Sequence, residues 1–285
     1  MFDKFDVYIG DELINNPKDL IDKIVINKRG ERHVIQEVLN EKEDYCIVKL
    51  RDCNNDVHLK EDYFMNVKII ENVSKQFKNF INQMEIKVLL HFTNVKNLSC
   101  ILENGLITRD NLSKLNCDTF INDIERYDKT NGISLSVSFP NYKMFYCVRK
   151  DNPNEDYCVI VLDPGILYEL DCGFFYTNSA NRIFKEREDI IYKKINSLKD
   201  MFADKYPPER LFGFTHLRET MSLPKSFTTD PQAEILVFEK IPLKYILGVV
   251  FENKEVMETY KEVSRKTKTI VEKSMFKYRQ DYECW

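Results

Sequence analysis

Residues 228–246 read TTDPQAEILVFEKIPLKYI, and the middle of this stretch predicts the strand on which the fold depends. The apolar run at 235–238 is typical of a buried strand, and Gln232 and Glu234 stand at its entrance. Side chains two residues apart on a strand share a face, so an amide and a carboxylate are expected together at the mouth of a sheet. Such a pair can orient a sugar hydroxyl and stabilise developing positive charge. A solvated strand end is the commoner explanation of an isolated pair, so other segments must support the site.

The composition is that of an ordinary globular protein. The chain has 285 residues, of which 43% are hydrophobic and 31% charged, enough for one large domain or for a medium and a small one. Lys and Arg total 42 against 46 Asp and Glu, a formal net charge of −4. Because there is no overall basic excess, any nucleic acid must be bound by a local patch.

The eight cysteines form no CxxC pair, and none lies near a histidine at the spacing of a zinc site. We therefore expect reduced thiols and no metal site. The first residues, MFDKFDVYIG, are acidic where a signal peptide is basic and apolar, and no apolar run approaches the length of a membrane span. These features predict a cytoplasmic protein without a membrane partner.

The N-terminal part is rich in short strands. Polar turns separate five β-rich runs, at 24–26, 33–38, 45–50, 57–59 and 67–70. They predict a small barrel of the SH3 or Tudor kind over residues 1–72, whose role as scaffold or ligand-binding module stays open. Apolar residues at helical spacing, from Phe77 to Met84, then predict a connecting helix over 73–85.

The segment 87–112 predicts a strand followed by a helix. The strand at 88–92 carries His91 and leads to Thr93 on the same face, and Gly105 is placed to end the helix. Backbone amides at a helix N-terminus favour polar or anionic ligands. A structural histidine is the alternative for His91 taken alone.

A second polar face follows at residues 133–137. Ser134 and Ser136 alternate with apolar residues on this predicted strand, which indicates either a wet outer face or a polar floor under a ligand. Tyr142 and Phe145 come next, in an aromatic helical turn, and are candidates to stack on a flat ring of a ligand.

Four motifs in order resemble the DarT-type nucleic-acid ADP-ribosyltransferase toxins. They are HxT with NLxxILxxGL from His91, ISLSVSFPNYKMFYCVRK from Ile133, FFYTNSAN from Phe174, and DPQAEILVFEKIPLKYI from Asp230. The resemblance covers residues 86–252 and implies an α+β ADP-ribosyltransferase fold, with split, mostly antiparallel sheets and helices. It also implies that NAD⁺ is consumed as co-substrate while ADP-ribose is transferred to a DNA base. Residues 253–285 are expected to add a C-terminal helical extension.

The resemblance assigns roles to individual residues. Glu234 matches the catalytic glutamate, with Gln232 two residues before it, and Arg126 best matches the arginine placed near the cofactor phosphates and the reacting base. His91 and Thr93 match the NAD-binding HxT. The other residues expected on the cofactor side are Asn97, Ser134, Ser136, Tyr142 and Phe145.

The chemistry agrees with this assignment. Loss of nicotinamide leaves an oxocarbenium-like sugar, which a nearby carboxylate stabilises. The chain has only eight glycines and no GxGxxG after a strand, which disfavours a dinucleotide-binding oxidoreductase. Because the target base must leave its stack, single-stranded nucleic acid is the expected partner.

Two alternatives stay open at this point. An RNA-directed ADP-ribosyltransferase would share the cofactor site, so DNA is favoured by the resemblance only. A non-catalytic module that binds ADP-ribose or nucleic acid is the other, and the joint presence of His91, Tyr142, Gln232 and Glu234 disfavours it. The resemblance further implies a toxin or phage-defence effector controlled by an antitoxin protein.

Overall fold

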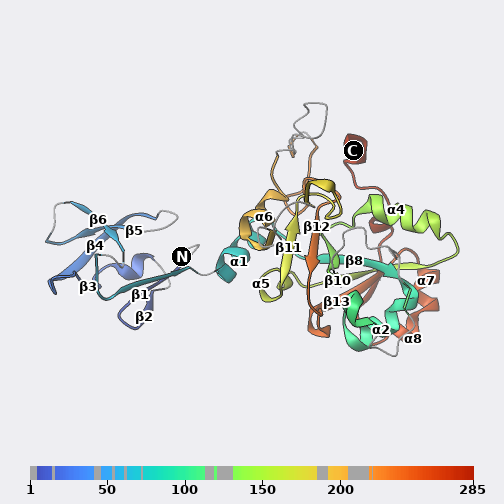
Figure 1. Ribbon diagram of the computed structural model, residues 1–285, viewed down its shortest axis with the longest axis horizontal. Helices are drawn as coiled ribbons and strands as arrows, with labels where there is room; N and C mark the ends of the chain where they lie inside the picture. Colours follow the sequence, from blue (N-terminus) through green and yellow to red (C-terminus); the bar gives the residue numbers. More distant parts are fainter. Residues whose placement is uncertain are drawn as a thin grey trace. The chain divides into compact units, whose positions relative to one another are not determined.

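The chain divides into two compact units, Met1–Asn79 and Phe80–Trp285 (Figure 1). The computed structural model describes residues 5–14, 17–41, 46–52, 55–60, 63–71, 73–112, 119–120, 131–184, 192–204, 218–219 and 221–285. Helix α1, Val73–Gln83, spans the boundary between the units, as the helical spacing of its apolar residues predicts.

The first unit contains two antiparallel sheets. One has the strand order β2-β1-β7, with bounds Glu12–Ile14, Phe5–Ile9 and Val67–Glu71. The other has the order β3-β4-β5-β6, with bounds Ile24–Ile26, Arg32–Glu41, Cys46–Leu50 and Asp56–Leu59, and a short 3₁₀ helix covers Pro17–Leu20. The five predicted strands are confirmed, whereas β1 and β2 were not predicted.

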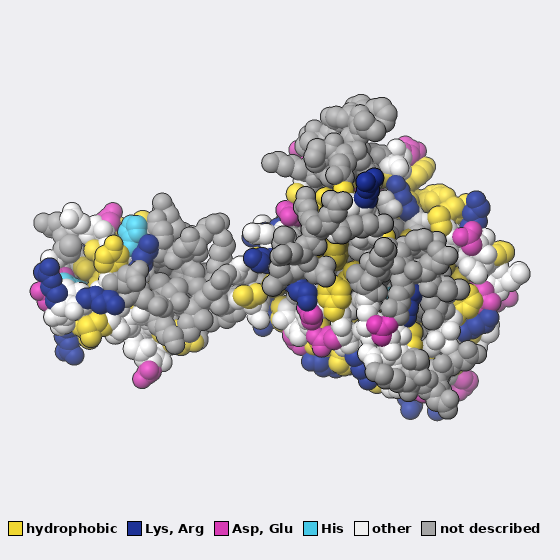
Figure 2. Space-filling model, viewed as in Figure 1, with side chains coloured by type: hydrophobic (Ala, Val, Ile, Leu, Met, Phe, Trp, Pro, Cys, Tyr) yellow, Lys and Arg dark blue, Asp and Glu magenta, His cyan; other side chains and the backbone are white. Residues whose placement is uncertain are grey.

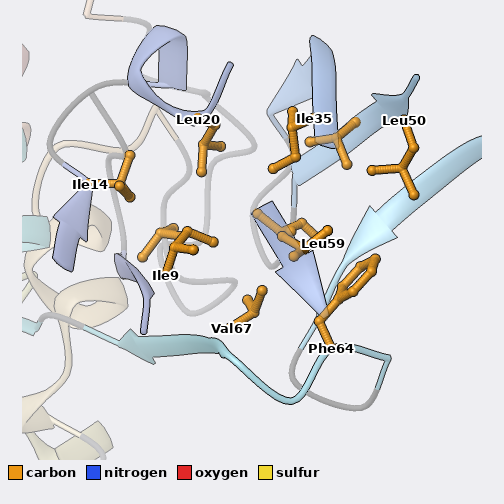
Figure 3. Close-up of a cluster of buried hydrophobic side chains, with 11 residues drawn as sticks. Ile9, Ile14, Leu20, Ile35, Leu50, Leu59, Phe64 and Val67 are labelled. Atoms are coloured by element: carbon orange, nitrogen blue, oxygen red, sulfur yellow. The ribbon is translucent and has the colours of Figure 1, made fainter. Parts of the chain in front are cut away.

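A single core joins these two sheets (Figure 3). Ile9 and Val67 come from one sheet and Ile35 and Leu59 from the other, and all four side chains are buried in the same cluster with Phe64. Neither sheet could bury its apolar face alone. The expected small β-rich unit is thus present as two sheets around one core.

The second unit is built on a seven-stranded sheet of order β11-β12-β9-β8-β10-β13-β14. The strand bounds, in that order, are Cys172–Phe175, Glu234–Val237, Ile133–Val137, Leu89–Asn94, Tyr157–Leu162, Ile246–Phe251 and Thr269–Val271. All neighbours are antiparallel except β13 and β14. The ladder between β8 and β9 has only two residue pairs, Leu89 with Val137 and Leu90 with Ser136. The sheet is therefore split into two halves, and the α+β prediction is confirmed.

Short helices surround this sheet. The α-helices are α2 Leu98–Asn104, α3 Arg109–Leu112, α4 Tyr142–Asp151, α5 Ile166–Glu169, α6 Ile195–Asp200, α7 Lys254–Thr259 and α8 Lys261–Ser264. The 3₁₀ helices are Val95–Asn97, Arg182–Phe184, Leu243–Tyr245, Lys273–Phe276 and Tyr282–Cys284. Helix α2 ends at Gly105, whose φ of 82° suits glycine. A Cβ atom there would lie 2.3 Å from the carbonyl oxygen of Ile241, so glycine is also required sterically.

The C-terminal segment differs from the helical extension expected from the sequence. Helices α7 and α8 are present, but Thr269–Val271 forms strand β14 and pairs in parallel with β13. The physical reason is that β13 would otherwise present an unpaired backbone edge. The last segment therefore extends the sheet of the second unit.

Two buried charged side chains, Arg279 and Asp281, fix this segment to the loop before β12. Arg279 and Asp281 form a bidentate ion pair, with Nε to Oδ1 at 2.6 Å and Nη2 to Oδ2 at 2.7 Å. The same guanidinium donates from Nη1 to the carbonyl oxygen of Thr228 at 2.8 Å and from Nη2 to that of Thr229 at 2.9 Å. We call these four residues the arginine clamp.

The surface carries charges of both signs. On the face shown in Figure 2, Lys and Arg side chains are interspersed with Asp and Glu side chains, in keeping with the net charge of −4. Within the described ranges, no helix is both long and apolar enough to cross a membrane.

Candidate functional site

A cavity of about 540 Å³ lies in the second unit, where strands β8, β9 and β12 meet helices α2, α3 and α4. It spans the narrow join between the two halves of the sheet, because both β8 and β9 line it. Its polar lining includes His91, Thr93, Asn97, Arg109, Ser134, Ser136, Ser179 and Glu234. Six of these eight were predicted from the sequence, and Ser179 and Arg109 were not. The volume is typical of small-molecule and cofactor sites.

Glu234 is the first residue of β12 and pairs with Phe175 of β11. Its side chain is partly buried, and its Oε2 accepts a hydrogen bond from the backbone N–H of Ser179 at 2.9 Å. That N–H belongs to the polar loop after β11, where Asn178 Oδ1 accepts from the N–H of Ala180 at 2.9 Å. The loop thus orients the carboxylate at the cavity, as the strand pattern predicts.

Gln232 is placed differently from the prediction. Strand β12 begins only at Glu234, and Gln232 lies in the preceding turn, where its N–H donates to Asp230 Oδ1 at 2.7 Å. The N–H of Ala233 donates to the carbonyl oxygen of Asp230 at 3.1 Å and completes that turn. The argument from a shared strand face therefore does not apply, and Gln232 is absent from the cavity lining.

His91 lies on β8 with its side chain partly buried. Its Nδ1 is 2.9 Å from the carbonyl oxygen of Ser134, so Nδ1 carries the proton of this bond. Burial lowers the pKa of His91, although the bond to Ser134 partly opposes this effect. The ring is therefore neutral at pH 7 and leaves Nε2 as an acceptor.

Thr93 and Asn97 form a fixed polar unit beside His91. Asn97 Nδ2 donates to Thr93 Oγ1 at 2.9 Å and to the carbonyl oxygen of Phe120 at 2.8 Å. Asn97 Oδ1 accepts from the N–H of Phe120 at 2.7 Å. Asn97 therefore ties β8 to residues 119–120, which also line the cavity. The buried Thr93 hydroxyl keeps its proton available as a donor.

The two serines of β9 have different environments. The Ser134 side chain is exposed and lines the cavity. Ser136 is buried, and its Oγ accepts a hydrogen bond from the N–H of Asn141 at 3.1 Å. Ser136 thus fixes the start of α4, while Ser134 presents its hydroxyl to the cavity.

Tyr142 and Phe145 do not stack on a ligand in the cavity, and this prediction is wrong. Phe145 is buried in the core and stacks on Phe92 with ring centroids 4.5 Å apart. Tyr142 is buried and packs edge-on against Tyr278 at 5.7 Å. The opposite face of α4 lines the cavity instead, through Met144, Cys147, Val148 and Asp151. The helix period explains the difference, because residues three and four apart share a face.

Arg109 was missed by the sequence interpretation. It is the first residue of α3, it lines the cavity, and its Nη1 is buried with no hydrogen-bond partner among the described residues. A buried donor without a partner is costly in a folded protein. Its segment, LITRDNL, gave no signal beyond a polar turn after Gly105. Arg126, the arginine that the sequence favoured, lies outside the described residues.

Two cysteines also line the cavity. Cys147 is a free, exposed thiol, whereas Cys100 is disulfide-bonded. The expectation of reduced thiols is therefore wrong for Cys100, because spacing along the chain says nothing about cysteines that meet only in the fold. Over the described ranges, no group of three or more His, Cys, Asp or Glu side chains is placed to hold a metal ion.

Comparisons with known proteins identify the family of the chain and similar solved structures. A family model described as ssDNA thymidine ADP-ribosyltransferase, DarT, matches residues 90–277. The chain is similar to Thermosipho africanus DarTG in complex with ADP-ribose (18% identity, TM-score 0.44, covering 67% of this chain and 51% of that one). It is also similar to Thermus sp. 2.9 DarT in complex with ADP-ribosylated ssDNA, at 13% identity and a TM-score of 0.47, covering 68% of this chain and 97% of that one. The same protein in complex with NAD⁺ matches at 13% identity and a TM-score of 0.43, covering 68% of this chain and 98% of that one. The match thus spans about half the length of the Thermosipho africanus chain. Comparison with curated proteins gives no match.

Proposed function

The chain belongs to the DarT family of ssDNA thymidine ADP-ribosyltransferases, and we propose that the cavity of its second unit is where ADP-ribose passes from NAD⁺ to a thymidine of single-stranded DNA. The single observation that supports this placement most strongly is Glu234, held by the N–H of Ser179 at the wall of the cavity. The volume of about 540 Å³ suits a cofactor-sized ligand.

The reaction breaks one bond and forms one bond. The bond between nicotinamide nitrogen and ribose C1′ breaks, and nicotinamide leaves with the electron pair. The ribose then carries oxocarbenium-like positive charge. In thymidine N1 already bears the deoxyribose, so N3 is the ring nitrogen left to attack C1′. The proton of N3–H must be accepted by a base as the new bond forms.

Glu234 is the residue proposed for this proton and for the developing charge. A carboxylate beside C1′ stabilises the positive sugar electrostatically, and it can take the proton from N3 as the nitrogen attacks. The N–H of Ser179 holds Oε2 of this carboxylate in place at the wall of the cavity. A preoriented carboxylate needs little reorganisation during the reaction.

His91, Thr93, Asn97 and Ser134 are proposed to hold NAD⁺. Neutral His91 has Nε2 as an acceptor for a ribose hydroxyl or the nicotinamide amide, because its Nδ1–H is used by the Ser134 carbonyl. Thr93 and Ser134 offer hydroxyl groups at the same wall. Asn97 acts indirectly, since its amide already bonds Thr93 and Phe120.

Arg109 is proposed to bind the diphosphate of NAD⁺. The cofactor brings phosphate charge into the cavity, and a guanidinium is the side chain best suited to pair with it. Nη1 of Arg109 is buried at this wall and has no partner among the described residues. A phosphate oxygen would supply the hydrogen bond that the described residues do not.

The biological setting extends the proposal. We infer a cytoplasmic toxin or defence effector that is restrained by an antitoxin protein. The supporting observations are the family membership and the similarity to a chain named DarTG. Co-expression with a candidate antitoxin, scored by growth and by modified DNA, tests this part separately from the chemistry.

The enzymatic proposal is tested by mass spectrometry of nucleic acid after incubation with NAD⁺. The full chain is mixed with single-stranded DNA that contains or lacks thymidine, and separately with RNA. Added ADP-ribose on thymidine-containing DNA alone supports the proposal. An adduct on RNA alone would contradict it in favour of an RNA acceptor, and no adduct on any of them would contradict the activity.

A further inference from the structure

Three tyrosines form an exposed aromatic cluster in the second unit. Tyr146 of α4 is 46% exposed, Tyr278 50% and Tyr282 47%. Tyr278 stacks on Tyr282 with ring centroids 5.3 Å apart and planes at 23°, and it lies 5.6 Å from Tyr146. We call these three residues the tyrosine platform. Aromatic rings grouped in this way on a surface indicate a binding site more strongly than scattered apolar residues do.

The arginine clamp holds the platform rigid. Tyr278 directly precedes Arg279 and Tyr282 directly follows Asp281, and the side chains of that ion pair are 2% and 0% exposed. Buried Tyr142 supports Tyr278 from below through an edge-on contact at 5.7 Å. The rings are therefore presented in a fixed arrangement, so a ligand would meet a preformed surface.

The tyrosine platform and the cavity are both reached from helix α4, because Tyr146 belongs to the platform and Cys147 lines the cavity. A helical wheel at 3.6 residues per turn places Lys150 and Lys143 between Tyr146 and Cys147, and Cys147 lines the cavity. Lys150 is exposed, while Lys143 Nζ also bonds the carbonyl oxygen of Trp285 at 3.0 Å. Two acidic side chains also lie here: Asp151 lines the cavity, and Glu283 Oε1 accepts a hydrogen bond from the Tyr282 hydroxyl at 3.1 Å. An α-helix is about 10 Å across, so the path from cavity to platform is short.

We propose that the tyrosine platform stacks bases of single-stranded DNA that flank the modified thymidine. The inference rests on the proposed function, which places the thymidine in the cavity. Aromatic rings offer stacking faces to any base, and lysines along the path attract the phosphate backbone. This combination favours nucleic acid over a protein partner, because the lysines would lie beside the apolar contact.

The test compares a long with a short DNA. Binding is measured by fluorescence anisotropy on full-length protein carrying Glu234→Gln, in the absence of NAD⁺, so that no transfer occurs. The probes are a thymidine-containing oligonucleotide of about twelve nucleotides, within the usual site sizes of such surfaces, and a trinucleotide that fills the cavity alone. The variants are Tyr278→Leu and Tyr146→Leu, which keep apolar volume but remove the ring. Tyr278→Phe keeps the ring, and Tyr63→Leu is the control at an exposed tyrosine of the first unit.

If the tyrosine platform stacks DNA bases, the leucine variants should bind only the long oligonucleotide more weakly. Each leucine variant should lose about tenfold in affinity for the long oligonucleotide, the size expected for one base–aromatic stack, and should bind the trinucleotide as before. Tyr278→Phe and Tyr63→Leu should match the starting protein. Unchanged affinity for the long probe in both leucine variants, with circular dichroism showing a folded chain, would overturn the inference. So would leucine variants that bind DNA normally but lose self-association or antitoxin binding.

The two proposals fail in different ways. If wild-type protein modifies neither DNA, the proposed function is wrong. If wild-type protein and the leucine variants modify both DNAs with equal KM values, the activity stands and only the platform is refuted.

Discussion

Arg279 and Arg109 lie in the same unit, but their guanidinium groups meet different surroundings. In the arginine clamp, Arg279 donates to both carboxylate oxygens of Asp281 and to the carbonyls of Thr228 and Thr229. In the cavity, Nη1 of Arg109 is buried without a partner among the described residues. Each guanidinium nitrogen of Arg279 thus has a partner inside the fold, whereas Nη1 of Arg109 has none among the described residues.

The difference separates stability from function. A buried ion pair whose donors and acceptors are satisfied fixes one geometry, and loss of one partner is costly. A buried donor without a partner lowers the stability of the fold, and the protein regains this free energy only when a ligand supplies an acceptor. The clamp joins the C-terminal segment to the backbone of Thr228 and Thr229, in the loop that leads into β12.

Arg279→Met should have the largest effect on stability. The change leaves Asp281 buried without its partner, and the free energy of unfolding should fall by about 3–5 kcal/mol. Chemical denaturation monitored by circular dichroism measures this. The double variant Arg279→Met/Asp281→Leu should recover part of the loss, since it removes the unpaired charge as well. Equal stability of the single variant and the wild type would contradict the role of the clamp.

Glu234→Gln should have the largest effect on rate. The amide keeps the size of the side chain but removes the charge and the base, so kcat should fall by about 10²–10³-fold, the range for loss of one electrostatic catalytic group. Melting temperature and the Kd for NAD⁺ should stay close to wild type. Gln232→Ala is the matched control two residues away, and an equal loss there would restore the predicted pair.

Arg109→Met should weaken NAD⁺ binding without lowering stability, in contrast to Arg279→Met in the arginine clamp. Because a hydrogen bond to a charged group contributes about 1.5–3 kcal/mol, loss of a phosphate contact should weaken NAD⁺ binding by about 10–100-fold. The free energy of unfolding should not fall, since no partner in the described protein is lost. Isothermal titration with NAD⁺ and with nicotinamide riboside separates the phosphate contact from the rest. An equal effect on both ligands would argue against the diphosphate assignment.

His91→Gln should change the free energy of unfolding by a small amount that depends on pH. Burial lowers the pKa of His91 below its ordinary value of 6.5, so the unfolded chain binds the proton more readily than the folded one. Well above pH 6.5 the imidazole is neutral in both the folded and the unfolded state, and this contribution is constant. As pH falls below 6.5, wild-type stability should decline more steeply than that of the variant. Parallel stability curves would contradict a buried neutral ring.

Periodicity and turn residues predicted much of the fold. The strands around His91 and Ser134 and the glycine at 105 follow from spacing and from backbone limits that each segment carries in its own residues. The position of Glu234 at the entrance of β12 was predicted in the same way, whereas its proposed role came from the resemblance. The split of the seven-stranded sheet came from the resemblance, since local patterns do not state which strands pair.

The missed features depend on contacts between distant segments. Phe145 could be read as a ligand-facing aromatic until its stack on Phe92 showed which face of α4 is buried. Arg279 joins carbonyls about fifty residues away, and neither partner carries a sequence signal for the other. The predicted placement of Gln232 on the strand was wrong for a local reason, because the turn at Asp230 delays the start of β12 until Glu234.

The narrow join between β8 and β9 has a mechanical consequence. Only two ladder pairs connect the three-stranded half β11-β12-β9 with the four-stranded half β8-β10-β13-β14, and the cavity lies across this line. A rotation of one half about this line would change the shape of the cavity and break few backbone hydrogen bonds, while each half kept its own strand pairing. Hydrogen exchange should then be faster at Leu90 and Ser136 than at the central residues of β10. The sheet would serve as a hinge as well as a frame.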